Sequence, residues 1–249
     1  MGANERDGGM WLGEARAPEG MRLYAIGDVH GCDGLLAAAH AAIAADLARH
    51  PVADHRIIHV GDYVDRGPDN PGVIERLAAA MERDPRVICL LGNHDAMMDA
   101  FLRAPALAGP DWLANGGDKT LADYGITADP KAGADDLAAI AAAFAARVPP
   151  RHRRFLADLA LSARFGDFFF CHAGIRPGVA LDAQDPEDLI WIRKPFLKDP
   201  SDHGVVVIHG HTPVREPEVM PNRIDIDTGA VWRGRLTTIA IEGTDYRFL

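Results

Sequence analysis

Acidic and imidazole side chains follow three apolar runs of this chain, each at the point where a buried strand would end. Residues 61–67 (GDYVDRG) follow the apolar run at 57–60 and carry two carboxylates and an arginine between glycines. Such a loop suits a site that holds a cation together with an anionic oxygen. The same pattern occurs at residues 27–31 (GDVHG) and 92–95 (GNHD). Because open α/β sheets form their sites at strand ends, these loops predict one shared site.

Two later strand-like runs end in histidines, within CHAG at residues 171–174 and HGHT at residues 209–212. The collected candidate metal ligands are Asp28, His30, Asp62, Asn93, His172 and His211. Carboxylates mixed with imidazoles suit manganese, iron or zinc better than calcium, which prefers oxygen alone. One catalytic ion with open positions needs fewer ligands, so the set predicts a pair of ions. Asp62, on the middle strand, is the natural bridging carboxylate, whereas His209 is interpreted as support behind the ligands.

Alternating strands and helices must position the first three loops. The apolar periodicity predicts strands at 22–26, 56–60 and 86–91, with helices at 34–49 and 71–83 between them. Elements of these lengths in this order indicate right-handed crossovers and a parallel arrangement of the three strands. We therefore expect the first three loops at one edge of one sheet.

The second half of the chain changes character. Residues 96–160 predict a helical insertion beside the site, with helices at 97–103, 119–124, 134–147 and 151–159 and a break through Pro110. Its alanine-rich runs are good helix formers, so a structural role is preferred. Six strand-like runs follow, at 161–165, 168–171, 205–208, 223–227, 236–241 and 246–249. Short connections between them indicate hairpins. The predicted fold is α/β, a mixed β-sandwich flanked by helices, in a single domain at 21–249 after a disordered tail at 1–20.

Composition excludes several classes of function. The net charge is -10 and no cluster of lysines and arginines occurs, which argues against nucleic-acid binding. No apolar segment has the length of a signal peptide core or a membrane span. The three cysteines form no CxxC pair. These features predict a cytoplasmic protein without a disulfide framework.

The motifs GDVHG, GDYVDRG, GNHD, HAG and HGHT, in this order, resemble the signature set of the phosphoprotein phosphatase family of binuclear metallophosphoesterases. Asp95 and Ala173 resemble the bacterial serine/threonine protein phosphatase branch. The resemblance implies a calcineurin-like metallophosphoesterase fold with α-β-β-α layers. It also implies that one ion is held by Asp28, His30 and Asp62. The second ion would be held by Asp62, Asn93, His172 and His211.

The resemblance further assigns roles in the reaction. A hydroxide bridging the two ions would attack phosphorus in line with the leaving alkoxide. Arg66 would hold phosphate oxygens bidentately, and Arg193, within the short match WIR, resembles a second phosphate-binding arginine of bacterial members. His94 would protonate the leaving group, with Asp65 orienting its imidazole.

Two further stretches resemble the bacterial branch without an assigned catalytic role. One comprises Trp112, the NGG sequence at 115–117 and Thr120 within the helical insertion. The other is the DTG sequence at 227–229, interpreted as fold support near the ligand loops.

The sequence therefore predicts a metal-dependent phosphomonoesterase, a serine/threonine protein phosphatase acting on a phosphoprotein or a small phosphoester. Manganese is the first choice of metal for assays, with iron and zinc as alternatives. One alternative function is a symmetrical diadenosine tetraphosphate hydrolase, a group in which alanine typically replaces Asp65. Another is a catalytically silent metal-binding scaffold, which the retention of His94 and both arginines argues against. Native metal, substrate preference, regulation and oligomeric state stay open.

Overall fold

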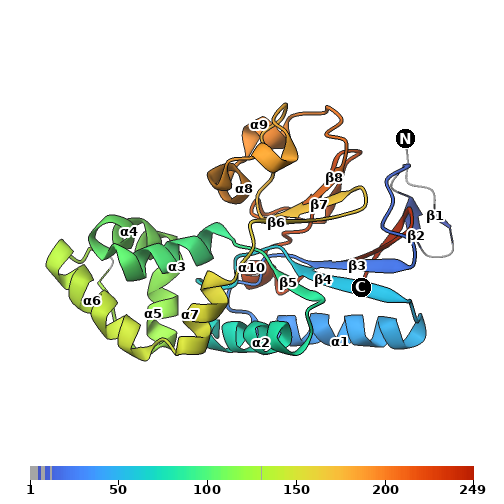
Figure 1. Ribbon diagram of the computed structural model, residues 1–249. Coiled ribbons are helices and arrows are strands. Elements are labelled where there is room, and N and C mark those ends of the chain that lie inside the picture. The colour runs from blue at the N-terminus through green and yellow to red at the C-terminus, as the bar shows by residue number, and fades with distance from the viewer. Residues whose placement is uncertain (1–4, 7–8, 12, 130) are drawn as a thin grey trace.

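Two β-sheets face each other in the computed structural model, with helices on their outer faces (Figure 1). The structure describes residues 5–6, 9–11, 13–129 and 131–249. Helices α1 (Asp33–Arg49) and α2 (Asn70–Arg83) lie along the outer face of the first sheet. Helices α8 (Pro186–Trp191) and α9 (Lys194–Leu197) cover the second sheet. This arrangement is the predicted mixed sandwich flanked by helices.

The first sheet has the strand order β1-β2-β12-β11-β3-β4-β5. Its strands are β1 (Glu5–Arg6), β2 (Gly9–Trp11), β3 (Met21–Ile26), β4 (Asp54–His59), β5 (Val87–Cys89), β11 (Thr238–Glu242) and β12 (Asp245–Phe248). Strands β3, β4 and β5 pair in parallel, as predicted, whereas β11 pairs antiparallel with β3. The carboxyl ends of the three parallel strands therefore meet at one edge of the sheet.

The second sheet has the order β6-β7-β8-β10-β9. Its strands are β6 (Ser162–Phe165), β7 (Phe168–Cys171), β8 (Val206–His209), β9 (Glu218–Val219) and β10 (Arg223–Asp225). The predicted hairpin is present as antiparallel β6 and β7, and β7, β8 and β10 run parallel. The ends of β7 and β8 lead directly into His172 and His211, so the second sheet contributes its own pair of histidines to the site.

Alternating side chains in the central strands form the core on both faces. In β3, Leu23 and Ala25 pack between the sheets, whereas Tyr24 and Ile26 pack under α1. Strand β7 alternates in the same way, with Phe168 facing inward. This two-residue alternation follows from the pleat of a β-strand, which points successive side chains to opposite faces. It also fixes the pairing register, because a one-residue slip would exchange the two buried faces.

The helical insertion contains no strand among its described residues. Its helices are α3 (Asn93–Arg103), α4 (Pro105–Trp112), α5 (Asp118–Asp123), α6 (Ala134–Arg147) and α7 (Pro150–Ala157), with a kinked turn at Leu113–Gly117 between α4 and α5. They pack at one end of the sandwich (Figure 1). The predicted break through Pro110 is wrong, because α4 continues through this proline. Tertiary packing explains the difference: Gly109 lies against Leu137 and Phe101 of neighbouring helices, and burial outweighs the poor helix propensity of the segment.

The end of the expected disordered tail also differs from the prediction. The backbone N–H of Ala17 donates to the carbonyl of Gly243, and Ala17 is buried. Arg16 and Asp167 are joined through backbone and side-chain hydrogen bonds. Residues 14–20 are therefore part of the folded structure, and β1 and β2 of the expected tail belong to the first sheet. Residues 1–4, 7–8 and 12 of the expected tail lie outside the described residues. No described helix combines the length and the apolar character required to cross a membrane.

Candidate active site

The loops that follow five strands, three in the first sheet and two in the second, converge on one buried centre. Those after β3, β4 and β5 carry Asp28, Asp62 and Asn93, and those after β7 and β8 carry His172 and His211. All of these side chains are buried. The polar side chains thus come from both sheets of the sandwich. Each sheet supplies part of a site that neither could form alone.

Backbone strain concentrates at this centre. Among described non-glycine residues, positive φ angles occur at His30, Asp62, Asp65, Arg66 and His211. All five are predicted site residues. A left-handed conformation at a non-glycine residue costs about 1–3 kcal/mol and persists only where the surroundings impose it. The fold therefore holds these loops in conformations that local preference alone would not produce.

Asp62 stands between two groups of potential ligands. Its Oδ2 lies 3.5 Å from Nε2 of His30. Its Oδ1 lies 3.3 Å from Nε2 of His172. The two groups that could hold a cation are His30, Asp62 and His94, and Asp62, His172 and His211. Asp62 is common to both, which is the position that the sequence predicts for a bridging carboxylate.

Two histidines are oriented by backbone carbonyls. Nδ1 of His30 lies 2.8 Å from the carbonyl of Val64, and Nδ1 of His172 lies 3.0 Å from that of Val60. Donation from Nδ1 leaves each Nε2 facing the centre, the arrangement that fixes the tautomer of a ligating histidine. Burial lowers the pKa of His30 to about 3, so its imidazole is neutral, with the Nε2 lone pair directed at the centre.

The second group brings several electron-pair donors together. Oδ1 of Asn93 lies 3.0 Å from Nε2 of His172 and 2.8 Å from Nδ1 of His211. Burial lowers the pKa of His211 to about 3, whereas burial is outweighed at His172 by Asp62, which raises the pKa of that histidine. Ring nitrogens and an amide oxygen in such close contact need a proton or a cation between them. The donor set therefore fits a metal ion.

The sequence groups Asp28 with His30 and Asp62, but its surroundings in the structure differ from that prediction. It is absent from the close group, in which His94 takes its place. Its Oδ2 accepts from the backbone N–H of His211 at 3.0 Å, and its buried Oδ1 has no hydrogen-bond partner. Burial and the nearby carboxylates of Asp227 and Asp62 raise its pKa. An unpartnered buried carboxylate oxygen among other acids also fits a cation.

The carboxylate of Asp95, noted in the sequence only as a mark of the bacterial branch, joins two of the loops. It accepts from the backbone N–H groups of Asp62, Tyr63 and Gly92, at 2.9, 2.9 and 3.0 Å. Burial raises its pKa to about 7, with Asp62 contributing. The loops must approach closely here, since a Cβ on Gly92 would lie 2.2 Å from Oδ1 of Asp62. The carboxylate of Asp95 therefore fixes the backbone at Asp62, and the absence of a Cβ at Gly92 leaves room for the side chain of Asp62.

Both predicted phosphate-binding arginines reach the centre. Nη1 of Arg66 lies 2.7 Å from Nε2 of His30, and its Nη2 lies 2.7 Å from Nε2 of His94. Nε of Arg193 donates to Nε2 of His211 at 3.0 Å. The two guanidinium groups therefore lie next to the two ligand groups, one beside each. They supply the positive charge that an anionic substrate requires.

His94 and Asp65 form a close pair at the first group. Nδ1 of His94 lies 2.6 Å from Oδ2 of Asp65, and Asp65 is completely buried. Burial raises the pKa of Asp65, although hydrogen bonding to His94 opposes this rise. The bond directs Nε2 of His94 toward the centre, where a proton can be exchanged with a bound group.

Two partly exposed tryptophans flank the centre, and the sequence analysis assigns neither to the site. Trp232 is 57% exposed, and its ring centre lies 5.1 Å from Cζ of Arg66. Trp191 is 40% exposed, and its ring centre lies 6.0 Å from that of His211. Their only sequence signal is proximity to motifs, since Trp191 precedes Arg193 by two positions and Trp232 follows DTG.

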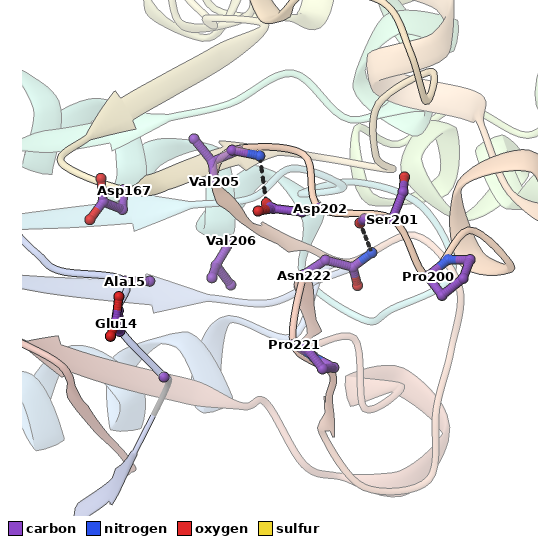
Figure 2. A pocket seen from close by; sticks show the side chains of 12 residues that line it. Glu14, Ala15, Asp167, Pro200, Ser201, Asp202, Val205, Val206, Pro221 and Asn222 are labelled. Carbon is purple, nitrogen blue, oxygen red and sulfur yellow. Dashed lines mark hydrogen bonds between the residues drawn. The ribbon is translucent and has the colours of Figure 1, made fainter. Parts of the chain in front are cut away.

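A separate cavity of about 560 Å³ lies away from this centre (Figure 2). Asp167, Asp202 and Asn222 are among its lining residues, which include no histidine or cysteine. Two of its polar side chains have partners: Asp202 accepts from the backbone of Gly204, and Asn222 donates to the carbonyl of Ser201. The cavity does not include any of the predicted site residues.

Comparison with known proteins agrees with this geometry. The model of the calcineurin-like phosphoesterase family matches residues 21–234. The chain belongs to this family. Metallophosphoesterases hydrolyse phosphoesters, and the candidate ligand groups imply that this member uses divalent metal ions.

Curated relatives of this metallophosphoesterase have two different names. A serine/threonine-protein phosphatase 1 of Salmonella typhimurium (strain LT2) is 29% identical over 229 residues, covering 88% of this chain and 92% of that protein. An asymmetrical bis(5'-nucleosyl)-tetraphosphatase PrpE of Anoxybacillus flavithermus (strain WK1) is 25% identical over 234 residues, covering 86% of this chain and 88% of that protein.

Solved structures confirm the metallophosphoesterase fold. A structure described provisionally as a diadenosine tetraphosphatase has a TM-score of 0.62 at 21% identity, covering 94% of this chain and 97% of that one. A metallophosphoesterase from Sphaerobacter thermophilus has a TM-score of 0.51 at 18% identity, covering 92% and 87%. At these identities the likeness concerns the fold alone.

Proposed function

We propose that this metallophosphoesterase is a phosphomonoesterase whose substrates are serine/threonine phosphoproteins. The observation that carries the proposal is the buried Asp65–His94 pair, held by a 2.6 Å contact beside the centre that Asp62 shares between two ligand groups. A monoester with a serine or threonine leaving group requires a proton at the departing oxygen, and the pair is placed to supply it.

In this proposal Asp28, His30 and Asp62 hold one ion. The second ion is held by Asp62, Asn93, His172 and His211, and manganese is the first metal to test. When bound, two such ions activate water and neutralise the charge that develops on the phosphoryl group. The Nε2 lone pair of His30, which faces the centre, and the unpartnered oxygen of Asp28 support this assignment.

The remaining residues of the centre bind the substrate and move a proton. Arg66 presents two guanidinium nitrogens toward the centre, which suits bidentate contact with phosphate oxygens. Arg193 adds a second positive charge beside His211. In this structure Nε2 of His94 accepts from Nη2 of Arg66. Once Arg66 contacts the phosphate instead, a proton on Nε2 of His94 can pass to the leaving oxygen, while Asp65 keeps the opposite nitrogen protonated and stabilises the imidazolium.

A second candidate function is hydrolysis of a dinucleoside polyphosphate. The names of the PrpE relatives favour it, and those relatives are asymmetrical enzymes, unlike the symmetrical hydrolase considered from the sequence. The exposed rings of Trp232 and Trp191 also favour it, since exposed aromatic faces beside a phosphate site can stack on nucleobases.

The deciding experiment is hydrolysis of a phosphoserine peptide, p-nitrophenyl phosphate and diadenosine tetraphosphate in parallel, with and without manganese. Metal-dependent turnover of both monoesters, with little of the dinucleotide, supports the phosphomonoesterase. Preferential cleavage of the dinucleotide replaces it with the second candidate. Absence of metal-dependent turnover on all three substrates contradicts both.

A further inference from the structure

Three side chains form hydrogen bonds with the Asp65 carboxylate, and two of them, Trp112 and Thr120, come from the helical insertion. His94 contacts Oδ2 at 2.6 Å. Thr120 donates its hydroxyl to Oδ1 at 2.6 Å, and Nε1 of Trp112 donates to Oδ1 and Oδ2 at 3.1 and 3.0 Å. Both donors are completely buried. Neither donor is in contact with solvent.

Thr120 holds Asp65 at two points. Besides donating to the carboxylate, its Oγ1 accepts from the backbone N–H of Asp65 at 3.0 Å. Asp65 has a φ of 72°, a conformation that costs free energy for a residue with a Cβ. A single hydroxyl thus fixes both the strained backbone and the rotation of the carboxylate.

The indole of Trp112 is itself held by packing. Its ring centre lies 4.8 Å from that of Phe101 and 5.7 Å from that of Phe144. A Cβ on Gly117 would lie 2.5 Å from the indole, so only glycine permits this close approach. The direction of the Nε1–H bond is therefore set by the core of the helical insertion.

The turn between Trp112 and Thr120 contacts the neighbouring arginine. The carbonyl of Gly116 accepts from the backbone N–H of Arg66 at 3.4 Å. Gly116 has a φ of 105°, and a Cβ there would lie 2.9 Å from Cγ of Arg66. The NGG stretch therefore brings the helical insertion against the loop that carries Asp65 and Arg66.

We propose that Trp112 and Thr120 are positioning residues that set the Asp65 carboxylate for its bond to His94, so that the helical insertion controls proton donation to the leaving group. The inference rests on the proposed function, because it assigns the residues behind the proposed general acid. Without these donors a buried carboxylate has one partner left and is free to rotate. The Nδ1 proton of His94 then loses its fixed acceptor, and Nε2 loses its fixed direction.

The variants separate hydrogen bonding from packing. Thr120→Val removes the hydroxyl at nearly constant volume, and Thr120→Ser retains it. Trp112→Phe keeps an aromatic ring and removes the indole N–H. Leu137→Ala is the control, because Leu137 is buried within the helical insertion and its side chain has no hydrogen-bonding group.

The first measurement is the downfield proton resonance of Nδ1 of His94, recorded by NMR on histidine-labelled protein without added metal and assigned with His94→Asn. We expect this resonance to be lost or shifted upfield in Thr120→Val and Trp112→Phe, and to be retained in Thr120→Ser and Leu137→Ala. An unchanged resonance in both Thr120→Val and Trp112→Phe overturns the inference. This readout requires no turnover, so it decides the inference even if the proposed function fails.

The second measurement compares kcat on two monoesters in the presence of manganese. A phosphoserine peptide has a strongly basic leaving group that needs protonation, whereas p-nitrophenyl phosphate has a weakly basic one. We expect Thr120→Val and Trp112→Phe to lower kcat by about tenfold or more on the peptide and by about twofold on the aryl ester. The difference arises because only the peptide's leaving group depends strongly on general acid catalysis. Equal losses on both esters contradict the inference. A wild-type protein inactive on both contradicts the proposed function instead.

Discussion

Nδ1 of His94 lies 2.6 Å from Oδ2 of Asp65, although the two residues are 29 positions apart in the chain. His94 is the second residue of α3, which follows β5, and Asp65 lies in the loop after β4. Because those strands are parallel neighbours, their loops meet at one sheet edge. The helical insertion then encloses the pair.

Replacement of His94 by asparagine is expected to lower kcat on a phosphoserine peptide by about 10²–10⁴-fold, the usual contribution of general acid–base catalysis. The bound metal should stay at the wild-type level, because Asn93 and Asp62 are unchanged. Turnover and metal content, measured on the same preparation, check both statements. The exposed His50→Asn is the matched control. Unchanged turnover in His94→Asn would remove this residue as the proton donor.

Replacement of Asp62 by asparagine is expected to weaken metal binding by at least about tenfold, because one neutral amide would replace the carboxylate shared by both ligand groups. Folding should survive, since the asparagine oxygen can still accept from the backbone N–H of His94. Metal content after dialysis, with circular dichroism alongside, measures the two effects. Asp167→Asn serves as the control away from the centre. Wild-type metal content in Asp62→Asn would rule out the bridging role.

Replacement of Trp232 by alanine is expected to raise KM for a monoester about two- to fivefold with little change in kcat. The ring stacks near the guanidinium of Arg66, and a cation–π contact at an exposed position contributes about 0.5–1 kcal/mol. The KM of Trp232→Phe, which keeps an aromatic ring, should lie between those of the wild type and Trp232→Ala. If alanine instead raises KM for diadenosine tetraphosphate far more than for the monoester, base stacking is the larger role of Trp232.

Low pH is expected to destabilise the folded protein through protonation of Asp46. Its carboxylate accepts from Arg247, Tyr24 and Arg22 at 2.6, 2.6 and 3.1 Å. Burial alone would raise the pKa of Asp46, but these bonds outweigh burial and lower it. A lowered pKa in the folded state means that the stabilisation is complete above the ordinary carboxyl pKa and is lost as pH falls through the folded value.

Asp46→Asn is therefore expected to lower the free energy of unfolding by about 2 kcal/mol at neutral pH, as for a lost charged hydrogen bond. The difference from the wild type should shrink as the pH falls below about 4, which is near the ordinary aspartate value. Urea denaturation of both proteins at a series of pH values measures this difference in the free energy of unfolding. Asp54→Asn, at a more exposed ion pair with Arg56, should lower the free energy of unfolding much less than Asp46→Asn. A difference for Asp46→Asn that is constant with pH would contradict the assignment.

Local patterns in the sequence were sufficient to predict the sandwich and to gather the candidate ligands. An apolar run followed by an acid or a histidine marks a strand end, and parallel strands necessarily bring their ends together. This reasoning places Asp28, Asp62 and Asn93 correctly at one edge. It also anticipates Asp62 at the position common to both ligand groups, because Asp62 follows the middle strand.

Tertiary structure decided the contacts that depend on packing between distant segments. Trp112 and Thr120 resemble a family pattern in the sequence, but only the folded helical insertion directs them at Asp65. Trp232 and Trp191 carry no periodic signal, and their placement beside Arg66 and His211 depends on how the second half of the chain folds back. The same holds for α4, where burial against neighbouring helices overrides the local preference of Gly109 and Pro110. Spacing along the chain predicts which residues follow strands, whereas the orientation of one side chain toward another depends on the packed core around both.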